Sequence, residues 1–161
     1  VDDFYAARSS SMPPLPWTSF SPPFSDGSVT AFYTVLMEGD DLDDPVAEEV
    51  RSILDGHIML SRKLAAANHF PAIDVLASKS RLMPQVASQK HRSCAGRVIT
   101  WMATYAENEL LLRVGEYQAG TDPDLDLALE KRPEINRFLQ QDMDENETFE
   151  STLEKLRRLA G

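Results

Sequence analysis

The sequence has one cysteine, and no apolar run approaches the roughly 18 residues of a membrane-spanning helix. A single Cys94 excludes an internal disulfide framework and a zinc site built from several cysteines. The N-terminal residues also lack the basic-then-apolar pattern of a secretion signal, so export of this chain is not indicated. With 42% hydrophobic and 26% charged residues, the composition predicts a globular, cytoplasmic chain.

Basic residues are outnumbered. The chain has 16 Lys and Arg against 26 Asp and Glu, a net charge of -10. This balance argues against nucleic-acid binding, which depends on clustered cations, and favours basic partners. His57, His69 and His91 fit no metal-ligand spacing, so no metal site is expected. Cys94 shares an apolar helical face with Val98, which predicts a small buried hydrophobe, not a nucleophile.

A phosphate-binding loop is also missing. The segment GEYQAG at 115–120 has the GxxxxG spacing, but Thr121 and Asp122 stand where Lys and Ser or Thr belong. It also follows a predicted helix, not a strand. We therefore expect that this chain cannot cleave ATP by itself.

Three regions differ in pattern. Residues 1–27 hold half of the ten prolines among many serines and predict a flexible lead-in, in which Trp17 and Phe20 could alternatively form a docking motif. Residues 28–87 predict a strand at 28–37, a helix from Pro45 capped by Asp44, strands at 57–60 and 72–76, and a short helix at 62–67 between those strands. Gly56 is expected to end the first helix in a left-handed turn. This alternation predicts the edge of a parallel α/β sheet.

The pattern of residues 88–161 predicts helices and no strands, with helices over about 88–105, 108–114, 123–131, 133–141 and 148–160. The last helix has an apolar stripe, and Glu154 and Arg158 are spaced to pair on its exposed side. We expect Leu153 and Leu156 of the stripe to be core, because a short chain needs every apolar face. Docking would then use polar outer positions. The stripe is Phe149, Leu153, Leu156 and Leu159, and the outer positions are Glu150, Glu154 and Arg157.

Four segments carry a family resemblance: GDDLDDP (39–45), HFPAID (69–74), DVLASKSR (74–81) and VGEYQAG (114–120). From residue 27 to the C-terminus the chain resembles the C-terminal part of the type III secretion ATPase, a homohexameric relative of the catalytic subunit of rotary ATP synthases. Residues 1–26 do not carry the resemblance, which suggests a truncated or frameshifted gene or an artificial junction. The implied fold class is α/β: the C-terminal edge of a RecA-like parallel-sheet ATPase domain (28–87), followed by a small all-α domain (88–161).

The resemblance implies roles for individual residues. Arg81 would be an arginine finger that reaches the γ-phosphate on a neighbouring subunit, although an Arg in such a loop is otherwise a solvated surface group. Lys79 stands where relatives usually have a small apolar residue. Phe70 and Tyr117 would flank the adenine ring of ATP, bound with Mg²⁺ in the hexamer; core packing is the alternative for both. The stalk-contact residues would be Asp40, Asp41 and Asp43; a solvated turn is the alternative for this acidic run.

The resemblance also implies partners and a place in the cell. The partners are neighbouring subunits of a homohexamer, a central stalk protein and complexes of secretion chaperones with their substrates, at the cytoplasmic face of the bacterial inner membrane. The implied function is to power virulence-related type III secretion by releasing chaperones and unfolding substrates. A flagellar export ATPase is the first alternative. A non-catalytic module that binds chaperones or the stalk is an alternative of another class.

Overall fold

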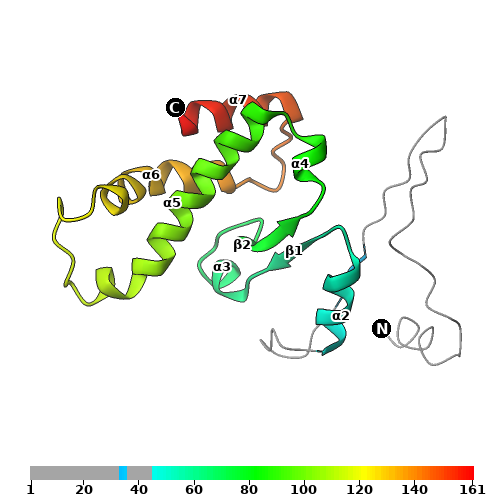
Figure 1. Ribbon diagram of the computed structural model, residues 1–161, viewed down its shortest axis with the longest axis horizontal. Helices are drawn as coiled ribbons and strands as arrows, with labels where there is room; N and C mark the ends of the chain where they lie inside the picture. The colour runs from blue at the N-terminus through cyan, green and yellow to red at the C-terminus, as the bar shows by residue number, and fades with distance from the viewer. Residues whose placement is uncertain (1–32, 36–44) are drawn as a thin grey trace, which may run out of the picture. The chain divides into compact units, whose positions relative to one another are not determined.

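The computed structural model describes residues 33–35 and 45–161 (Figure 1). The chain divides into two compact units, Val1–Asp55 and Gly56–Gly161, and each is described by itself. Residues 33–35 form neither helix nor strand. The rest of the strand predicted at 28–37, the lead-in and Asp44 lie outside the described residues.

In the first unit, α2 (Pro45–Ile53) begins at the predicted proline. Pro45 suits this position because the first helical residue needs no N–H donor. Val50, Ile53 and Leu54 are half-buried. On the polar side, Arg51 pairs with Glu48 at 2.5 Å, one turn earlier.

The second unit begins with two paired strands, β1 (Gly56–Leu60) and β2 (Ile73–Ser80). They pair antiparallel, with Leu60 opposite Ile73 and Gly56 opposite Ser80, so the prediction of parallel strands is wrong for this pair. The reason lies in the connection. The helix α3 (Arg62–Ala66) has five residues, and the N–H of Ser61 already donates to the carbonyl of Ala72 at 2.8 Å. The chain therefore turns straight back, whereas a parallel crossover must return to the start of β1.

Gly56 does not form the expected left-handed turn. The described glycines with positive φ are Gly115, Gly120 and Gly161, and Gly56 is the first residue of β1. A Cβ atom at Gly56 would lie 2.7 Å from the carbonyl oxygen of Lys79. Glycine is needed here because the two strands approach closely, not because of its left-handed freedom.

After β2, the chain forms a short helix that the sequence does not predict, α4 (Met83–Val86), and then the long helix α5 (Gln89–Arg113). The hydroxyl of Ser88 caps α5 by accepting from the N–H of His91 at 3.2 Å. Two helices were predicted over α5, but it is continuous. Nothing breaks it near Ala106, and the amide of Asn108 donates to the carbonyl of Thr104 at 2.9 Å, within the helix.

The next helix, α6 (Pro123–Leu139), also joins two predicted helices, and it runs through Pro133. The side chain of Asp122 caps it by accepting from the N–H groups of Asp124 and Leu125. An internal proline costs a helix about 3 kcal/mol. Burial on both sides of Pro133 offsets this, since Leu125 and Ile135 are 1% and 3% exposed.

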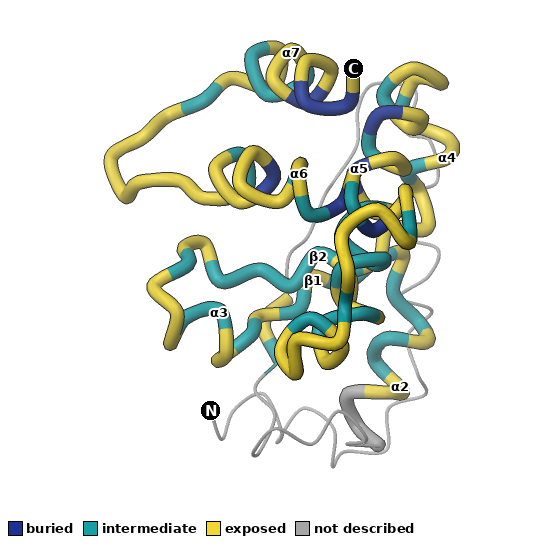
Figure 2. Tube along the Cα trace, turned by 90° about the vertical axis from the view of Figure 1, so that its left-hand side faces the viewer, coloured by how far each residue is buried: buried dark blue, intermediate teal, exposed yellow. Residues whose placement is uncertain are grey.

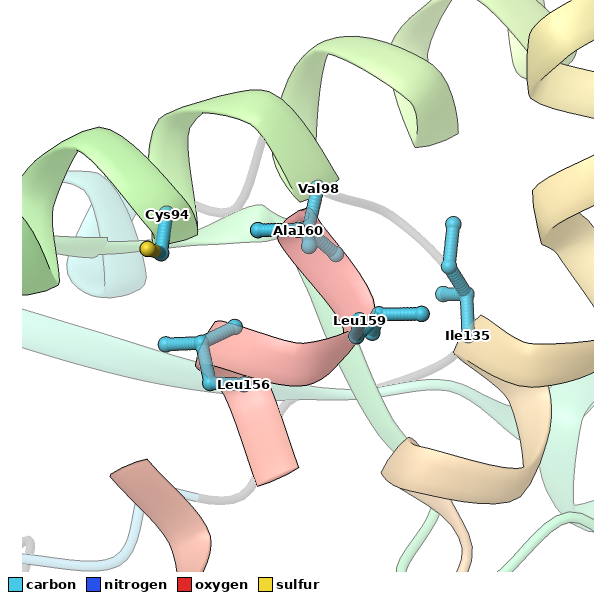
Figure 3. Close-up of a cluster of buried hydrophobic side chains, with 6 residues drawn as sticks. All are labelled: Cys94, Val98, Ile135, Leu156, Leu159 and Ala160. Atoms are coloured by element: carbon cyan, nitrogen blue, oxygen red, sulfur yellow. The ribbon is translucent and has the colours of Figure 1, made fainter. Parts of the chain in front are cut away.

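The last helix, α7 (Phe149–Ala160), packs with α5 and α6 around one apolar cluster (Figure 3). Figure 2 shows the buried stretches on these three helices. The confinement of the core to helix crossings fits a small helical domain. The cluster consists of Cys94, Val98, Ile135, Leu156, Leu159 and Ala160.

The buried role of Cys94 is thereby confirmed, and so is that of Leu156, at 7% exposure. Leu153 is half-buried, and Phe149, at 64% exposure, contacts the ring of His91 edge-on. The predicted pair of Glu154 and Arg158 forms at 2.5 Å. None of the helices among residues 45–161 is long and apolar enough to cross a membrane.

Candidate functional site

Arg81 lies one residue beyond the end of β2, on a bend before α4, and its side chain is exposed. The bend is held by the hydroxyl of Ser80, which accepts from the N–H of Met83 at 3.1 Å. The strand before it is also fixed. The hydroxyl of Ser78 donates to the carbonyl of Asp74 at 2.5 Å and accepts from the N–H of Met59 at 2.9 Å. A rigid strand thus delivers a cationic side chain to the surface of the unit.

Lys79 stands opposite His57 in the sheet and is exposed like Arg81. The ring of His57 bonds through Nε2 to the carbonyl of Ala77 at 3.0 Å, which further fixes the strand. Lys79 and Arg81 place two cationic side chains within three residues at this end of β2. Such a site attracts anionic groups.

Phe70 lies in the loop before β2, joined to Pro71 by a cis peptide bond. Its side chain is 52% exposed, so it is not a core residue of this unit. Its carbonyl accepts a hydrogen bond of 2.9 Å from the N–H of Gln141, just after α6. The loop before the strand therefore meets the end of the helical part.

A concavity of about 520 Å³ adjoins this meeting point, between the end of α6, the following loop and α7. Pro71, Phe138 and Gln141 are among the residues that line it. Sequence reasoning did not find Phe138 or Gln141 as neighbours of this loop. A helix pattern gives no information about which distant loop will pack on its last turn.

Tyr117 lies in the connection between α5 and α6 and is half-buried. Its hydroxyl donates to the Asp126 carboxylate at 2.8 Å and lies 3.1 Å from the carbonyl of Asp122. The pKa of Tyr117 is raised, mainly by burial and next by the hydrogen bond to the Asp126 carboxylate. The same carboxylate accepts from the N–H of Gly120 at 2.8 Å. The 115–120 segment follows a helix, as predicted, and it is pinned onto the first turns of α6.

The structure does not bring Phe70 and Tyr117 together within the chain. Phe70 is tied to Gln141, beyond the end of α6, whereas Tyr117 is tied to Asp126, near its start. At 1.5 Å per helical residue, these two attachment points are about 20 Å apart. Phe70 and Tyr117 are therefore attached at opposite ends of α6.

The other predicted site residues, Asp40, Asp41 and Asp43, lie outside the described residues. Over residues 33–35 and 45–161, no three His, Cys, Asp or Glu side chains gather in a way that could hold a metal ion.

Two family models match the chain. Residues 87–158 match the T3SS EscN ATPase C-terminal domain, and residues 18–80 match the nucleotide-binding domain of the ATP synthase alpha/beta family. The second match begins at residue 18, inside the segment 1–26 that carried no resemblance in the sequence analysis. The family sequence therefore starts earlier than we expected.

Curated relatives agree with both models. The chain is 54% identical over 133 residues to the SPI-2 type 3 secretion system ATPase of Salmonella typhimurium, and 52% identical over 138 residues to the flagellum-specific ATP synthase of Treponema pallidum. These alignments cover 83% and 86% of this chain and 31% of each relative. The chain thus spans about a third of the length of these relatives.

Solved structures have the same fold. The assembled ATPase EscN of the enteropathogenic E. coli type III secretion system matches with a TM-score of 0.79 at 47% identity, over 84% of this chain and 33% of that one. EscN in complex with its central stalk EscO matches with a TM-score of 0.75 at 45% identity, over 84% of this chain and 32% of that one. The chain belongs to the type III secretion ATPase family and corresponds to the C-terminal part of its RecA-like α/β domain followed by the helical domain.

Proposed function

We propose that this chain is the C-terminal part of a hexameric ATPase that powers type III protein secretion, and that Arg81 acts on ATP bound to a neighbouring subunit. The observation that carries the proposal is the place of Arg81: exposed, at the end of a strand whose hydrogen bonds fix it, in the segment DVLASKSR. The assembled state of the related EscN supports a ring.

A guanidinium suits this role because it stays charged at every physiological pH and presents a planar fork of donors. The fork can pair with two oxygens of a phosphoryl group as charge develops on them. Fingers of this kind typically change rates by about 10³ to 10⁵. The bend held by Ser80 would keep the guanidinium in place before the nucleotide arrives.

The nucleotide would be ATP with Mg²⁺, which supplies the transferable phosphoryl group. Phe70 would lie against the adenine ring, and its exposure in this unit leaves a face available for stacking. Tyr117, whose attachment point on α6 is about 20 Å from that of Phe70, would contact adenine only if the base lay at the α5–α6 connection instead of at Phe70. Its hydroxyl is engaged by Asp126, so its part in adenine binding would use the ring and not the OH group.

The proposed partners follow the two parts of the chain. Asp40, Asp41 and Asp43 would face a basic central stalk, and the solved complex of EscN with EscO supports a stalk partner. The helical domain, 88–161, would dock chaperone–substrate complexes through exposed positions such as Glu150, Glu154 and Arg157. The assembly would work at the cytoplasmic face of the inner membrane.

The proposal is tested by comparing the 161-residue chain with a chimera that places residues 28–161 behind the preceding part of the Salmonella SPI-2 ATPase. We expect the chain alone to show no ATPase activity and only weak ATP affinity, because most of the binding energy comes from phosphate and Mg²⁺ contacts. The chimera should form a hexamer that hydrolyses ATP. Sub-micromolar ATP binding by the chain alone, or a hexameric chimera without activity, would contradict the proposal.

A flagellar export ATPase is the second candidate, because the Treponema pallidum relative matches almost as well as the SPI-2 one. The same chimera separates the two in strains that lack either the SPI-2 ATPase or the flagellar ATPase. Restored secretion without restored motility supports the first function. The reverse result supports the second.

A further inference from the structure

A second concavity, of about 470 Å³, lies where α5 begins and α7 ends. Cys94, which belongs to the buried cluster drawn in Figure 3, is one of the residues that line it. Both walls are helices that pack on each other through this cluster, so the shape of the concavity is fixed by the core. The other lining residues are Gln89, Lys90, Ser93, Arg97, Arg157 and Gly161.

The charges that line this basic concavity are almost all positive. Lys90 and Arg97 are two turns apart on one face of α5, and Arg157 comes from α7. None of the described residues that line it has an acidic side chain. A net positive site is unexpected in a chain of net charge -10.

These three cations also differ from other cations of the described helices. Lys63, Lys131 and Lys155 are each held by a carboxylate. Lys90, Arg97 and Arg157 make no ion pair with any carboxylate in the described ranges, 33–35 and 45–161. Their charges are therefore available to an external anion.

The polarity of α5 adds to these charges. Lys90 lies in the first turn, where the helix carries a partial positive charge and where acidic residues are usually favoured, yet this turn has none. At the other wall, the C-terminal end of α7 weakens the field beside Arg157. The positive potential is thus strongest over Lys90 and Arg97, where Ser93 and Gln89 offer neutral donors.

We propose that the basic concavity binds an acidic segment of a protein partner, with carboxylates of the segment paired to Lys90, Arg97 and Arg157. The volume exceeds that of a single small anion, and three separated cations need several carboxylates. Duplex DNA fits less well, because its non-specific affinity comes from about 6 to 10 phosphate contacts. This inference does not rest on the ATPase activity or on Arg81.

The test uses the 161-residue chain and a fluorescein-labelled peptide of alternating Glu and Ser, followed by fluorescence anisotropy. The matched control peptide has Gln in place of Glu. We expect the Glu peptide to bind, with affinity that falls as salt rises, and the Gln peptide not to bind. Equal binding of the two peptides, or binding of neither, overturns the proposal.

Arg97→Glu should weaken binding by about tenfold or more, because a charge-assisted pair is replaced by repulsion. Lys131→Glu on α6 is the matched control: it changes the net charge by the same amount, and we expect an effect below about twofold. Lys90→Glu serves as a second variant, and thermal melts confirm that each variant folds. An equal loss in Lys131→Glu would show that only net charge matters and would overturn the proposal.

Two competitors of the Glu peptide test whether the basic concavity binds another class of ligand. Inorganic phosphate and a short DNA duplex are added to the chain with its bound Glu peptide. If phosphate displaces the peptide at low millimolar concentration, the concavity is a small-anion site. If the duplex binds more tightly than the peptide, it is a nucleic-acid site. Either result overturns the assignment to an acidic protein segment, and failure of both to compete supports it.

Discussion

The N–H of Gln141 donates a 2.9 Å hydrogen bond to the carbonyl oxygen of Phe70. This bond ties the loop before β2 to the end of α6. The ring of Phe70 is left 52% exposed beside a concavity that is lined by Phe138 and Gln141. A nucleotide held at Phe70 would therefore be close to both parts of the second unit.

If Phe70 stacks on adenine, Phe70→Ala in the chimera should weaken ATP affinity by about 2- to 10-fold, since such contacts are worth about 0.5 to 1.5 kcal/mol. Phe70→Tyr should preserve it, because the ring remains. Titration of a fluorescent ATP analogue measures both. Ile99→Ala, which removes another exposed apolar side chain on α5, is the control. Unchanged affinity in Phe70→Ala would remove this residue from the adenine site.

Two substitutions at Tyr117 distinguish a structural role of this residue from a role in nucleotide binding. Tyr117→Phe keeps the ring and removes the bond to Asp126, so we expect a lower urea midpoint with unchanged ATP affinity of the chimera. Tyr117→Leu should lower both if the ring stacks on adenine. A loss of stability in both variants without any change in affinity would leave Tyr117 a purely structural role.

The raised pKa of Tyr117 adds a pH dependence. The folded state favours the neutral phenol, so this contribution is fully present below the ordinary pKa of 10.0 and is lost as pH rises above it. The stability difference between the wild type and Tyr117→Phe should therefore shrink above about pH 10. Urea unfolding at neutral and alkaline pH measures it, and a difference that stays constant would contradict the assigned cause.

Local patterns predicted much of the fold. A proline marked the start of α2 at Pro45, and the helical pattern began near the observed starts of α5 and α6, because a helix start depends on a few adjacent residues. Pro133 was misread as a helix boundary, since its cost is offset by core burial that no local pattern shows. The antiparallel pairing of β1 and β2 was missed for a similar reason: strand direction depends on how the connection folds.

The candidate site was likewise only partly predictable from the sequence. The sequence pointed to Arg81, and the structure places that residue, exposed, at a strand end. The sequence could not show that Phe70 contacts Gln141 or that Tyr117 contacts Asp126, because both contacts depend on the course of α6. The two aromatic residues therefore looked like one site in the sequence, but their attachment points are about 20 Å apart along α6.

Substitutions at buried and at half-buried positions of α7 should differ in how much they destabilise the domain. Leu156→Ala should lower the free energy of unfolding by about 2 to 5 kcal/mol, because Leu156 packs in the buried cluster. The half-buried Leu153 is the matched control, and Leu153→Ala should cost about 1 kcal/mol. Urea unfolding compares them. Equal costs would show that the cluster does not stabilise the domain as described.

The most direct test of the proposed function is the ATPase rate of the chimera with Arg81→Lys. Lysine keeps the charge but loses the planar fork, so the rate should fall by about 10³ or more, with little change in the affinity for ATP. Lys79→Ala, which removes a charge two residues earlier, within β2, should retain most of the rate. If Arg81→Lys also retained most of the rate, Arg81 would not be the finger that acts on a neighbouring subunit.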